Sequence, residues 1–194
     1  DGKEITSAKE AAELYGYGSP LHQMFRILRP ISGEGVGGIP TVAYPQVSDV
    51  AAAATEHEWT VTGTATANAV HTILIAGRSS VDFMEYKYSV VIDDTPTAIA
   101  TKIKDAINAV LGSPVTATSA LGVVTITTKW EGITSAALVT KIDYANAAGL
   151  SYSKTAETLG SGTVSLAGAL AQFGDTWNTI VINPYGTDQL TDLE

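Results

Sequence analysis

Residues 94–128 read DTPTAIATKIKDAINAVLGSPVTATSALGVVTITT, and this stretch decides the fold class. Asp94, Thr95 and Pro96 are typical of a helix start, because a capping oxygen precedes a proline that the first helical position tolerates. Apolar side chains then recur at helical spacing and predict one buried stripe, formed by Ile99, Ile103, Ile107 and Val110. Gly112 is the expected C-terminal cap. The sequence therefore predicts one amphipathic helix here.

Outside this helix, the middle of the chain has the pattern of β-strands. Val and Thr alternate around the turn at residues 120–122, which predicts a hairpin of 115–118 with 123–128. Period-two alternation places hydroxyl-bearing side chains on one face of residues 59–66. Further strands are expected at 71–75, 81–92 and 138–144. Strands, one helix, then strands predict a small antiparallel or mixed sheet with a helix on one face.

Both ends of the chain have α/β character. Ser7 and Glu10 have capping-box spacing, and Ser19 followed by Pro20 indicates a second helix start. The second helix is expected to face a core through Leu21, Met24, Phe25 and Leu28. A glycine-rich loop (31–38), a strand (41–44), a short helix (166–173), an apolar strand buried on both faces (178–183) and a helix from Thr187 complete the expected elements.

These patterns predict an α+β fold with a discontinuous organisation. Residues 51–58 are small and polar and are interpreted as a linker, and composition changes again near residues 160–162. Residues 1–50 and 163–194 are predicted to form one α/β unit, and residues 51–162 an inserted β-rich domain carrying one helix. Neither end has enough elements to bury a core alone, which favours their packing together.

Composition excludes several kinds of protein. The net charge of −9 and pI near 4.7 disfavour binding to nucleic acid or to anionic membrane surfaces. The chain has no cysteine, so thiolate metal sites, disulfides and cysteine nucleophiles are excluded. No apolar run reaches the roughly 18 residues of a membrane span, and no signal peptide opens the chain. It begins at Asp1 without Met, which we interpret as the cut edge of a longer protein.

Gly33, Gly35 and Gly38 match the literal pattern G-x-G-x-x-G. A nucleotide site requires this pattern after a strand and at the start of a helix. Here it follows a helix and Pro30, and it leads into a strand. A flexible loop is therefore the preferred interpretation.

The three histidines do not have metal-ligand spacing. His57 lies in the expected linker between Glu56 and Glu58, where a solvated cluster is expected. His71 begins an alternating strand and is expected on its exposed polar face. His22 lies beside the apolar stripe of the second helix and is expected to be partly buried or at an interface.

Two arrangements could suggest hydrolytic chemistry. Ser19 lies in Gly16-Tyr17-Gly18-Ser19, but Pro20 and the absence of an upstream strand favour a helix cap over a nucleophile elbow. Asp93 and Asp94 could form a carboxylate pair, but they precede a helix start, where carboxylates favour free amides. We therefore predict no catalytic, cofactor-binding or metal-binding residues, no cofactor and no enzymatic activity.

Aromatic side chains leave a second interpretation open. A sugar-binding platform could form on the β-rich domain from Trp59, Trp130, Trp177, Tyr86 and Tyr88. Alternation places Tyr86 and Tyr88 on one strand face with Met84, and a half-buried sheet face explains this equally well.

Segments along most of the chain resemble, in order, the tail sheath proteins of Mu-like contractile phages. Residues 8–16 (AKEAAELYG) and 18–24 (GSPLHQM) resemble the opening of the sheath body. The remaining similarities are to the family's insertion and closing element: 61–66 (VTGTAT), 75–78 (IAGR), 98–108, 114–118, 124–127, 170–182 and 184–188 (PYGTD). No single segment is specific, but their serial arrangement is. The sequence departs from the family pattern at 129–138 and 160–168.

The resemblance implies a structural role. Sheath subunits polymerise around a tail tube as a helical array and contract to drive the tube through the host envelope. The implied partners are other sheath subunits, the tail tube protein, the baseplate and the tail terminator. The implied location is the virion tail sheath, after assembly in the host cytoplasm. Terminal arms that the family uses to join subunits would be missing, so we expect a monomer or weak oligomer.

Three alternatives remain open at this point. One is a carbohydrate-binding or adhesin module of a phage particle that uses the β-rich insertion. Another is a hydrolase with carboxylates at Asp93 and Asp94. The last is the sheath of a related machine, such as a prophage-derived tailocin or a secretion system.

Overall fold

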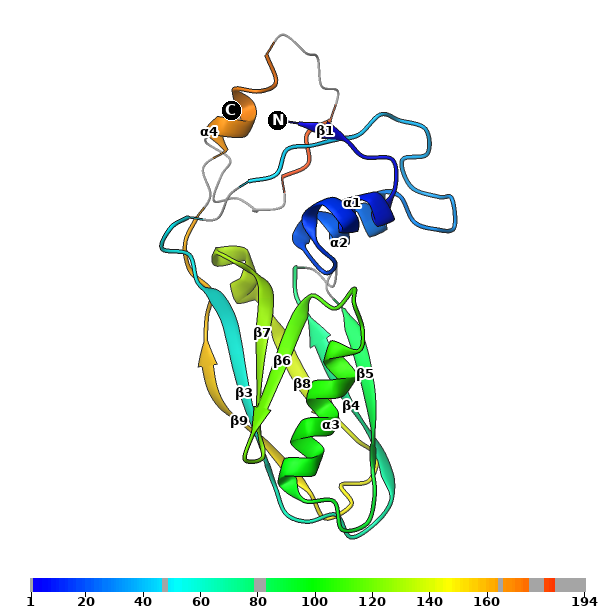
Figure 1. Ribbon diagram of the computed structural model, residues 1–194, viewed down its shortest axis with the longest axis vertical. Coiled ribbons are helices and arrows are strands. Elements are labelled where there is room, and N and C mark those ends of the chain that lie inside the picture. The colour runs from blue at the N-terminus through cyan, green and yellow to red at the C-terminus, as the bar shows by residue number, and fades with distance from the viewer. Residues whose placement is uncertain (1, 47–48, 79–82, 164–165, 175–179, 184–194) are drawn as a thin grey trace.

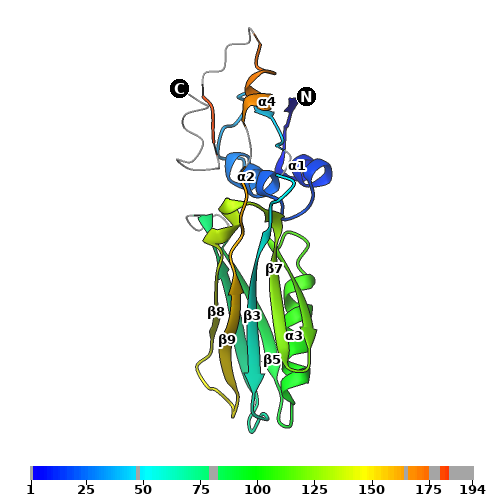
Figure 2. The same ribbon diagram turned by 90° about the vertical axis from the view of Figure 1, so that its left-hand side faces the viewer.

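The computed structural model describes residues 2–46, 49–78, 83–163, 166–174 and 180–183. It has an elongated shape with two regions (Figures 1 and 2). The larger region, which we call the β-rich unit, spans residues 54–158. The smaller region, the helical end, comprises residues 3–43 and 166–183 as far as they are described. Helices and antiparallel sheets together confirm the predicted α+β class.

The β-rich unit contains two antiparallel sheets. One has the order β6-β7-β3-β9 and the other β5-β4-β8. Their strands are β3 (Ala54–Thr62), β4 (Ala69–Ala76), β5 (Met84–Val90), β6 (Val115–Ala120), β7 (Val123–Glu131), β8 (Val139–Asp143) and β9 (Ser151–Thr158). The expectation of a single sheet was therefore wrong. One helix cannot cover seven strands, so the inward apolar faces of two sheets cover each other.

Helix α3 (Pro96–Asn108) packs between the β5 and β6 sides of the two sheets, as Figure 1 shows. Ile99, Ile103 and Ile107 are fully buried, which confirms most of the predicted stripe. The helix ends four residues before Gly112, so Val110 lies beyond it and is exposed. The Asn108 side chain instead binds both backbone groups of Ala117 in β6, at 2.8 and 2.9 Å. This contact joins the helix end to the sheet edge.

The predicted hairpin is confirmed. Leu121 and Gly122 connect β6 to β7 with φ values of 49° and 83°. Positive φ at both central residues is the signature of a type I′ turn, whose twist suits two antiparallel strands. Leucine is unusual there, because a bulky side chain disfavours left-handed backbone.

The interpretation of residues 51–58 as a linker was wrong from residue 54 onward, where β3 begins. Thr55 and His57 point into the unit with no exposed surface, while Glu56 is exposed. The alternation of β3 thus begins with polar residues on its buried side, and this is why the segment has the composition of a linker.

In the helical end, strand β1 (Lys3–Glu4) pairs with β2 (Val42–Ala43), and helices α1 (Ala8–Tyr15) and α2 (Pro20–Leu28) lie between them in the chain. Ser7 caps α1 by accepting from the Glu10 amide at 3.1 Å. The capping box is only half formed, because the Glu10 carboxylate accepts from the backbone and hydroxyl of Thr6, both at 2.8 Å.

The buried face of α2 is rotated from the predicted one. Phe25 is buried, but Leu21, Met24 and Leu28 are only partly buried, and His22 and Gln23 are buried instead. The cause is contact with the β-rich unit, where Gln23 Nε2 donates to the carbonyl of Gly112 at 2.8 Å. Lys129 in β7 also donates to the carbonyl of Tyr17, at 3.1 Å.

The C-terminal part of the helical end holds helix α4 (Ala167–Leu170), shorter than the predicted 166–173. Residues 180–182 are exposed and in no strand, so the predicted buried strand is wrong where it is described. Residues 178–179, Trp177 and the helix predicted from Thr187 lie outside the described residues. Tyr44 and Phe173 have ring centroids 4.7 Å apart, so the segments before and after the β-rich unit contact each other there. The division into domains remains a prediction.

Candidate functional site

The glycine-rich segment forms a loop closed by Arg29. The Arg29 guanidinium donates to the carbonyl of Gly37 at 2.6 Å, to that of Ile39 at 2.5 Å and to the Thr41 hydroxyl at 3.1 Å. The segment after Gly38 leads to β2 and not to a helix. In this arrangement the loop offers carbonyl oxygens to a cation of its own chain. Its position supports the loop interpretation over a phosphate site.

Ser19 and Asp94 have structural partners. Ser19 caps α2 by accepting from the His22 amide at 3.2 Å, as predicted. Asp94 accepts from the Val91 amide at 2.7 Å and from Lys102 at 2.5 Å. Burial raises the pKa of Asp94, but its bonds to Lys102 and to the Val91 amide outweigh burial and lower it overall. Asp93 is exposed, with a φ of 70°.

The predictions for two of the three histidines were wrong. His57 and His71 were expected in solvent, and both are fully buried between the sheets. His22 is buried as expected, and its Nδ1 accepts from the Gly18 amide at 2.9 Å. An alternating pattern gives the period of a strand but does not say which face is covered. His57 lies on β3 and His71 on β4, which belong to different sheets, and each histidine is on the face of its sheet that the other sheet covers.

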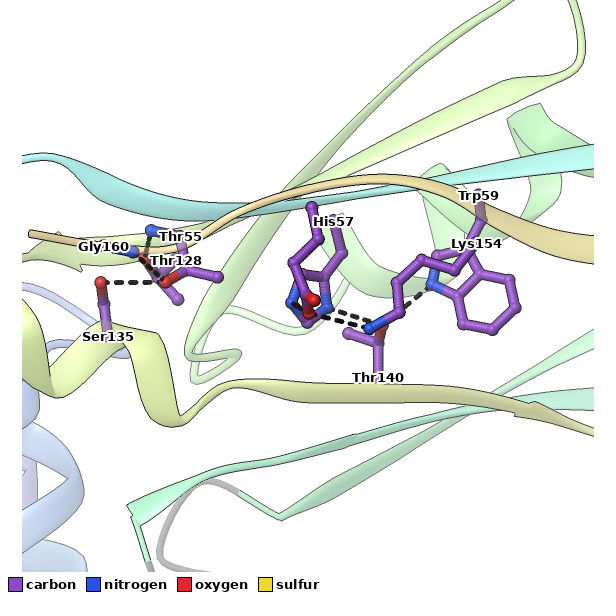
Figure 3. Close-up of polar contacts among 9 residues, drawn as sticks. Thr55, His57, Trp59, Thr128, Ser135, Thr140, Lys154 and Gly160 are labelled. Carbon is purple, nitrogen blue, oxygen red and sulfur yellow. Dashed lines mark hydrogen bonds and ion pairs between the residues drawn. The ribbon is translucent and has the colours of Figure 1, made fainter.

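The inter-sheet seam is a group of polar side chains where β9 and β3 face β8: His57, Trp59, Thr140, Lys154 and Glu157. His57 Nδ1 lies 2.8 Å from Thr140 Oγ1. Trp59 Nε1 donates to the same oxygen at 2.9 Å. His57 Nε2 lies 2.7 Å from Glu157 Oε1, without the alignment of a hydrogen bond, and Lys154 Nζ is 2.8 Å from that carboxylate oxygen. Figure 3 shows Thr140 placed between His57 and Trp59.

The charges of the seam favour a neutral imidazole. Burial is the main cause that lowers the pKa of His57, and the Lys154 ammonium acts in the same direction. The Glu157 carboxylate opposes both without reversing them. The pKa of Glu157 is itself lowered, chiefly by its bond to Lys154. In the neutral ring, the Thr140 hydroxyl can donate to Nδ1 while Nε2–H faces the carboxylate.

A second buried group surrounds His71 on β4. His71 Nδ1 lies 2.6 Å from the hydroxyl of Tyr152 on β9, and Nε2 lies 2.8 Å from the carbonyl of Asn146. The rings of Tyr88, Tyr144 and Tyr152 pack around the imidazole with centroids 4.9–5.8 Å away. Burial raises the pKa of Tyr152 to about 12 and also raises that of Tyr88.

A third network, also in Figure 3, lies at the neck, which we define as residues 53–55 and 160–161, where the chain enters and leaves the β-rich unit. The Thr55 hydroxyl accepts from the Gly160 amide at 2.7 Å and lies 3.2 Å from the Ser135 hydroxyl. Ser135 belongs to the short helix η2 (Ile133–Ala137). Ala53 and Ser161 exchange backbone bonds of 2.9 and 3.2 Å. Hydrogen bonds therefore join the segment that enters the β-rich unit to the segment that leaves it.

Thr140, His57 and Glu157 place a hydroxyl, an imidazole and a carboxylate in sequence, as acyl-transfer catalysts do. Thr140 is only 6% exposed, and its oxygen already accepts from Trp59. The hydroxyl therefore faces the sheet interior and not a substrate. Among the described residues, no three His, Asp or Glu side chains gather as a metal site would require. The seam connects β8 to β9 through the buried His57 and Thr140, and its β9 end is exposed at Glu157.

The aromatic side chains proposed as a sugar platform point mostly inward. Tyr86 and Tyr88 are buried, as is Trp130, which stacks under the Arg78 guanidinium at 4.1 Å and donates to Thr134. Trp59 is only partly exposed and bonds Thr140. The described aromatic residues of this set therefore form no exposed platform.

The surface of the helical end carries exposed aliphatic side chains. They lie on α2, in the following loop, in β2 and in the last described segment: Ile27, Ile31, Ile39, Val42, Ile180, Val181 and Ile182. Ile31 is fully exposed and Ile180 is 78% exposed. None of the helices in the described ranges combines the length and apolar character needed to cross a bilayer.

No protein-family model matches this chain, and no curated protein matches it either.

Proposed function

We propose that this chain is a structural subunit of a contractile tail sheath of the Mu-like phage kind, with no active site. The sequence support is the serial order of resembling segments from residue 8 to residue 188. The structural support is the exposed segment Ile180-Val181-Ile182, which carries three consecutive aliphatic residues in no strand. That segment is the observation on which the structural argument rests.

Exposed aliphatic residues in such a run are costly in an isolated protein. Burying one aliphatic side chain lowers the free energy by about 1.5–3 kcal/mol relative to leaving that side chain in water. Larger exposed apolar patches mark sites of protein contact. Ile180, Val181 and Ile182 are 78, 49 and 52% exposed, so much of their burial is left to be gained by association.

The helical end is the proposed assembly region, because its own core is small. Among its described residues, the buried cluster consists of Ile5, Ala11, Phe25 and Ala43. The first partner is another copy of the chain in a helical array, whose contacts join different surfaces and do not close. The tail tube protein, the baseplate and the tail terminator are the further proposed partners. The sheath contracts by exchanging one packing of subunits for another.

The glycan-binding alternative is less favoured. It requires aromatic rings on the surface, and Tyr86, Tyr88 and Trp130 are buried. Phe83 and Tyr144 of the β-rich unit are exposed, but the Tyr144 ring packs on His71, which leaves Phe83. One ring is less than the stacked set that a sugar platform uses.

Electron microscopy of the gene product, with any residues that flank these 194, tests the proposal. We expect hollow tubes or stacked rings. The double substitution Ile180→Asp and Ile182→Asp is expected to abolish them, because charge in this segment prevents its burial. The matched control is Leu121→Asp, which changes a 92% exposed aliphatic residue of the β-rich unit. Dispersed wild-type particles at high concentration, or tubes formed by the double variant, would contradict the proposal.

A further inference from the structure

Strand β9 lies at the edge of its sheet and pairs with β3 alone among the described strands. Seven of its eight residues are exposed, and only Tyr152 is partly buried. Its ladder with β3 is interrupted by a register shift next to Trp59. Such a strand is weakly held by packing, so its inward polar contacts have a large share in keeping it in place.

Those contacts lead to buried histidines. Glu157 meets His57 of β3, which in turn contacts Thr140 of β8. Tyr152 meets His71 of β4. Both imidazoles have no exposed surface, and both lie where β9 faces the opposite sheet. Separation of β9 from the unit would bring water to both rings.

We propose that β9 is an acid-released latch, in which protonation of His57 loosens this strand from the sandwich while β3, β6 and β7 stay paired. A protonated Nδ1 donates to Thr140 Oγ1 and can no longer accept from it, so the hydrogen of this almost fully buried hydroxyl loses its acceptor. The positive charge of the protonated imidazole also lies near the Lys154 ammonium, which repels it. Both effects favour a state in which water reaches the ring.

The charged groups around His57 come from few elements. Glu157 and Lys154 of β9 face it, and β8 presents the neutral Thr140. Lys141 and Asp143 of β8 are exposed and pair with each other. On β3, Glu56 accepts from Thr127 on the outer face of the sheet, and Glu58 occupies the same side by alternation.

The direction of the pH response follows from the lowered pKa of His57 in the closed state. Burial lowers the pKa of His57, so a water-exposed imidazole, with a pKa near 6.5, binds the proton more tightly. The latch is therefore closed above about pH 6.5 and loosens as the pH falls below that value. One proton changes the opening equilibrium by at most about tenfold per pH unit.

Amide hydrogen exchange of the whole chain at pH 7.5 and pH 5.5, corrected for intrinsic rates, tests this proposal. We expect protection in residues 151–158 to fall several-fold relative to β7 at the lower pH. His57→Gln should remove this pH dependence. The matched control is His22→Gln, which changes another buried histidine, located in α2 and bonded to Gly18, and should leave the β9 response unaltered.

Lys154→Gln provides a second variant in case His57→Gln does not fold. It removes the ammonium that disfavours a protonated ring, so the loss of β9 protection should be smaller than in the wild type. Parallel loss of protection in β7 and β9 would indicate global unfolding and overturn the latch. Unchanged β9 protection at pH 5.5, or a full response in His57→Gln, would overturn it as well.

Discussion

The β-rich unit and the helical end contain similar aliphatic residues but bury them very differently. In the β-rich unit, nineteen buried residues from two sheets and α3 form one cluster. In the described part of the helical end the corresponding cluster has four residues, while Ile27, Ile31 and Ile39 remain exposed. The difference lies in the number of covering elements. Two sheets and a helix enclose a space, whereas the described elements of the helical end, three short helices and a two-stranded sheet, do not.

The β-rich unit is stabilised by its own core, whereas the helical end would bury more apolar surface by association with another molecule. Most buried polar side chains in the described part of the β-rich unit have hydrogen-bond partners, as the bonds of Thr55, Thr140 and His71 show, and the exceptions are His57 Nε2 and the Tyr88 hydroxyl. The helical end docks on it through few polar contacts, such as Gln23 with Gly112. We therefore expect the two regions to respond differently to substitution.

The largest expected effect is in the core of the β-rich unit. Ile103→Ala should lower its free energy of unfolding by about 2–5 kcal/mol, because Ile103 is fully buried and a cavity would remain. Phe25→Ala should instead destabilise the helical end and leave the midpoint of the β-rich unit nearly unchanged. Urea unfolding followed by circular dichroism and by hydrogen exchange measures both. Equal loss in both regions after Phe25→Ala would show that the molecule unfolds as one unit.

A smaller effect is expected at the neck between the two regions. A Cβ at Gly160 would lie 1.8 Å from Ser135 Oγ and 2.7 Å from the carbonyl of Gly132. Gly160→Ala should therefore cost about 1–3 kcal/mol in thermal or urea unfolding. Gly168→Ala is the matched control, because a Cβ there meets nothing within 4 Å. A neutral Gly160→Ala would mean that the neck network adds little to stability.

The pH dependence of the helical end is expected to depend on His22. Burial lowers the pKa of His22, and the charges of Arg26 and Lys129 act in the same direction. The unfolded chain then binds the proton more tightly, so stability is complete above about pH 6.5 and falls at lower pH. One proton contributes at most about 1.4 kcal/mol per pH unit. Unfolding midpoints from pH 7.5 to 5 should fall in the wild type and fall less in His22→Gln. Equal slopes would contradict this assignment.

The smallest effect, and a stabilising one, is expected at the hairpin turn of the β-rich unit. Leu121→Asn should raise the free energy of unfolding by roughly 0.5–1 kcal/mol, because Asn tolerates the positive φ of this position better than Leu. Leu121→Ala shortens the exposed side chain without relieving the backbone and should change little. Thermal unfolding of the two variants measures the difference. Destabilisation by Leu121→Asn would show that the Leu121 side chain has a packing role within the chain.

Local patterns determined much of the fold. Thr95-Pro96 and the spacing of Ile99, Ile103 and Ile107 were sufficient to predict α3, and the turn at 120–122 predicted the hairpin. Ser19 was recognised as a cap for the same reason. These features depend on hydrogen bonds and backbone preferences within a few residues, so a single sequence contains the information.

Only the tertiary structure decided which faces are covered. His57 and His71 have the sequence context of exposed polar residues, and they are buried because a second sheet faces their strands. The inter-sheet seam joins His57 to Thr140 and Glu157, which are 83 and 100 positions away in the chain. Residues 180–182 show the converse, since an apolar run is buried only where partner strands are available. Burial depends on long-range contacts, and these are set by how the elements assemble and not by the local pattern of any one of them.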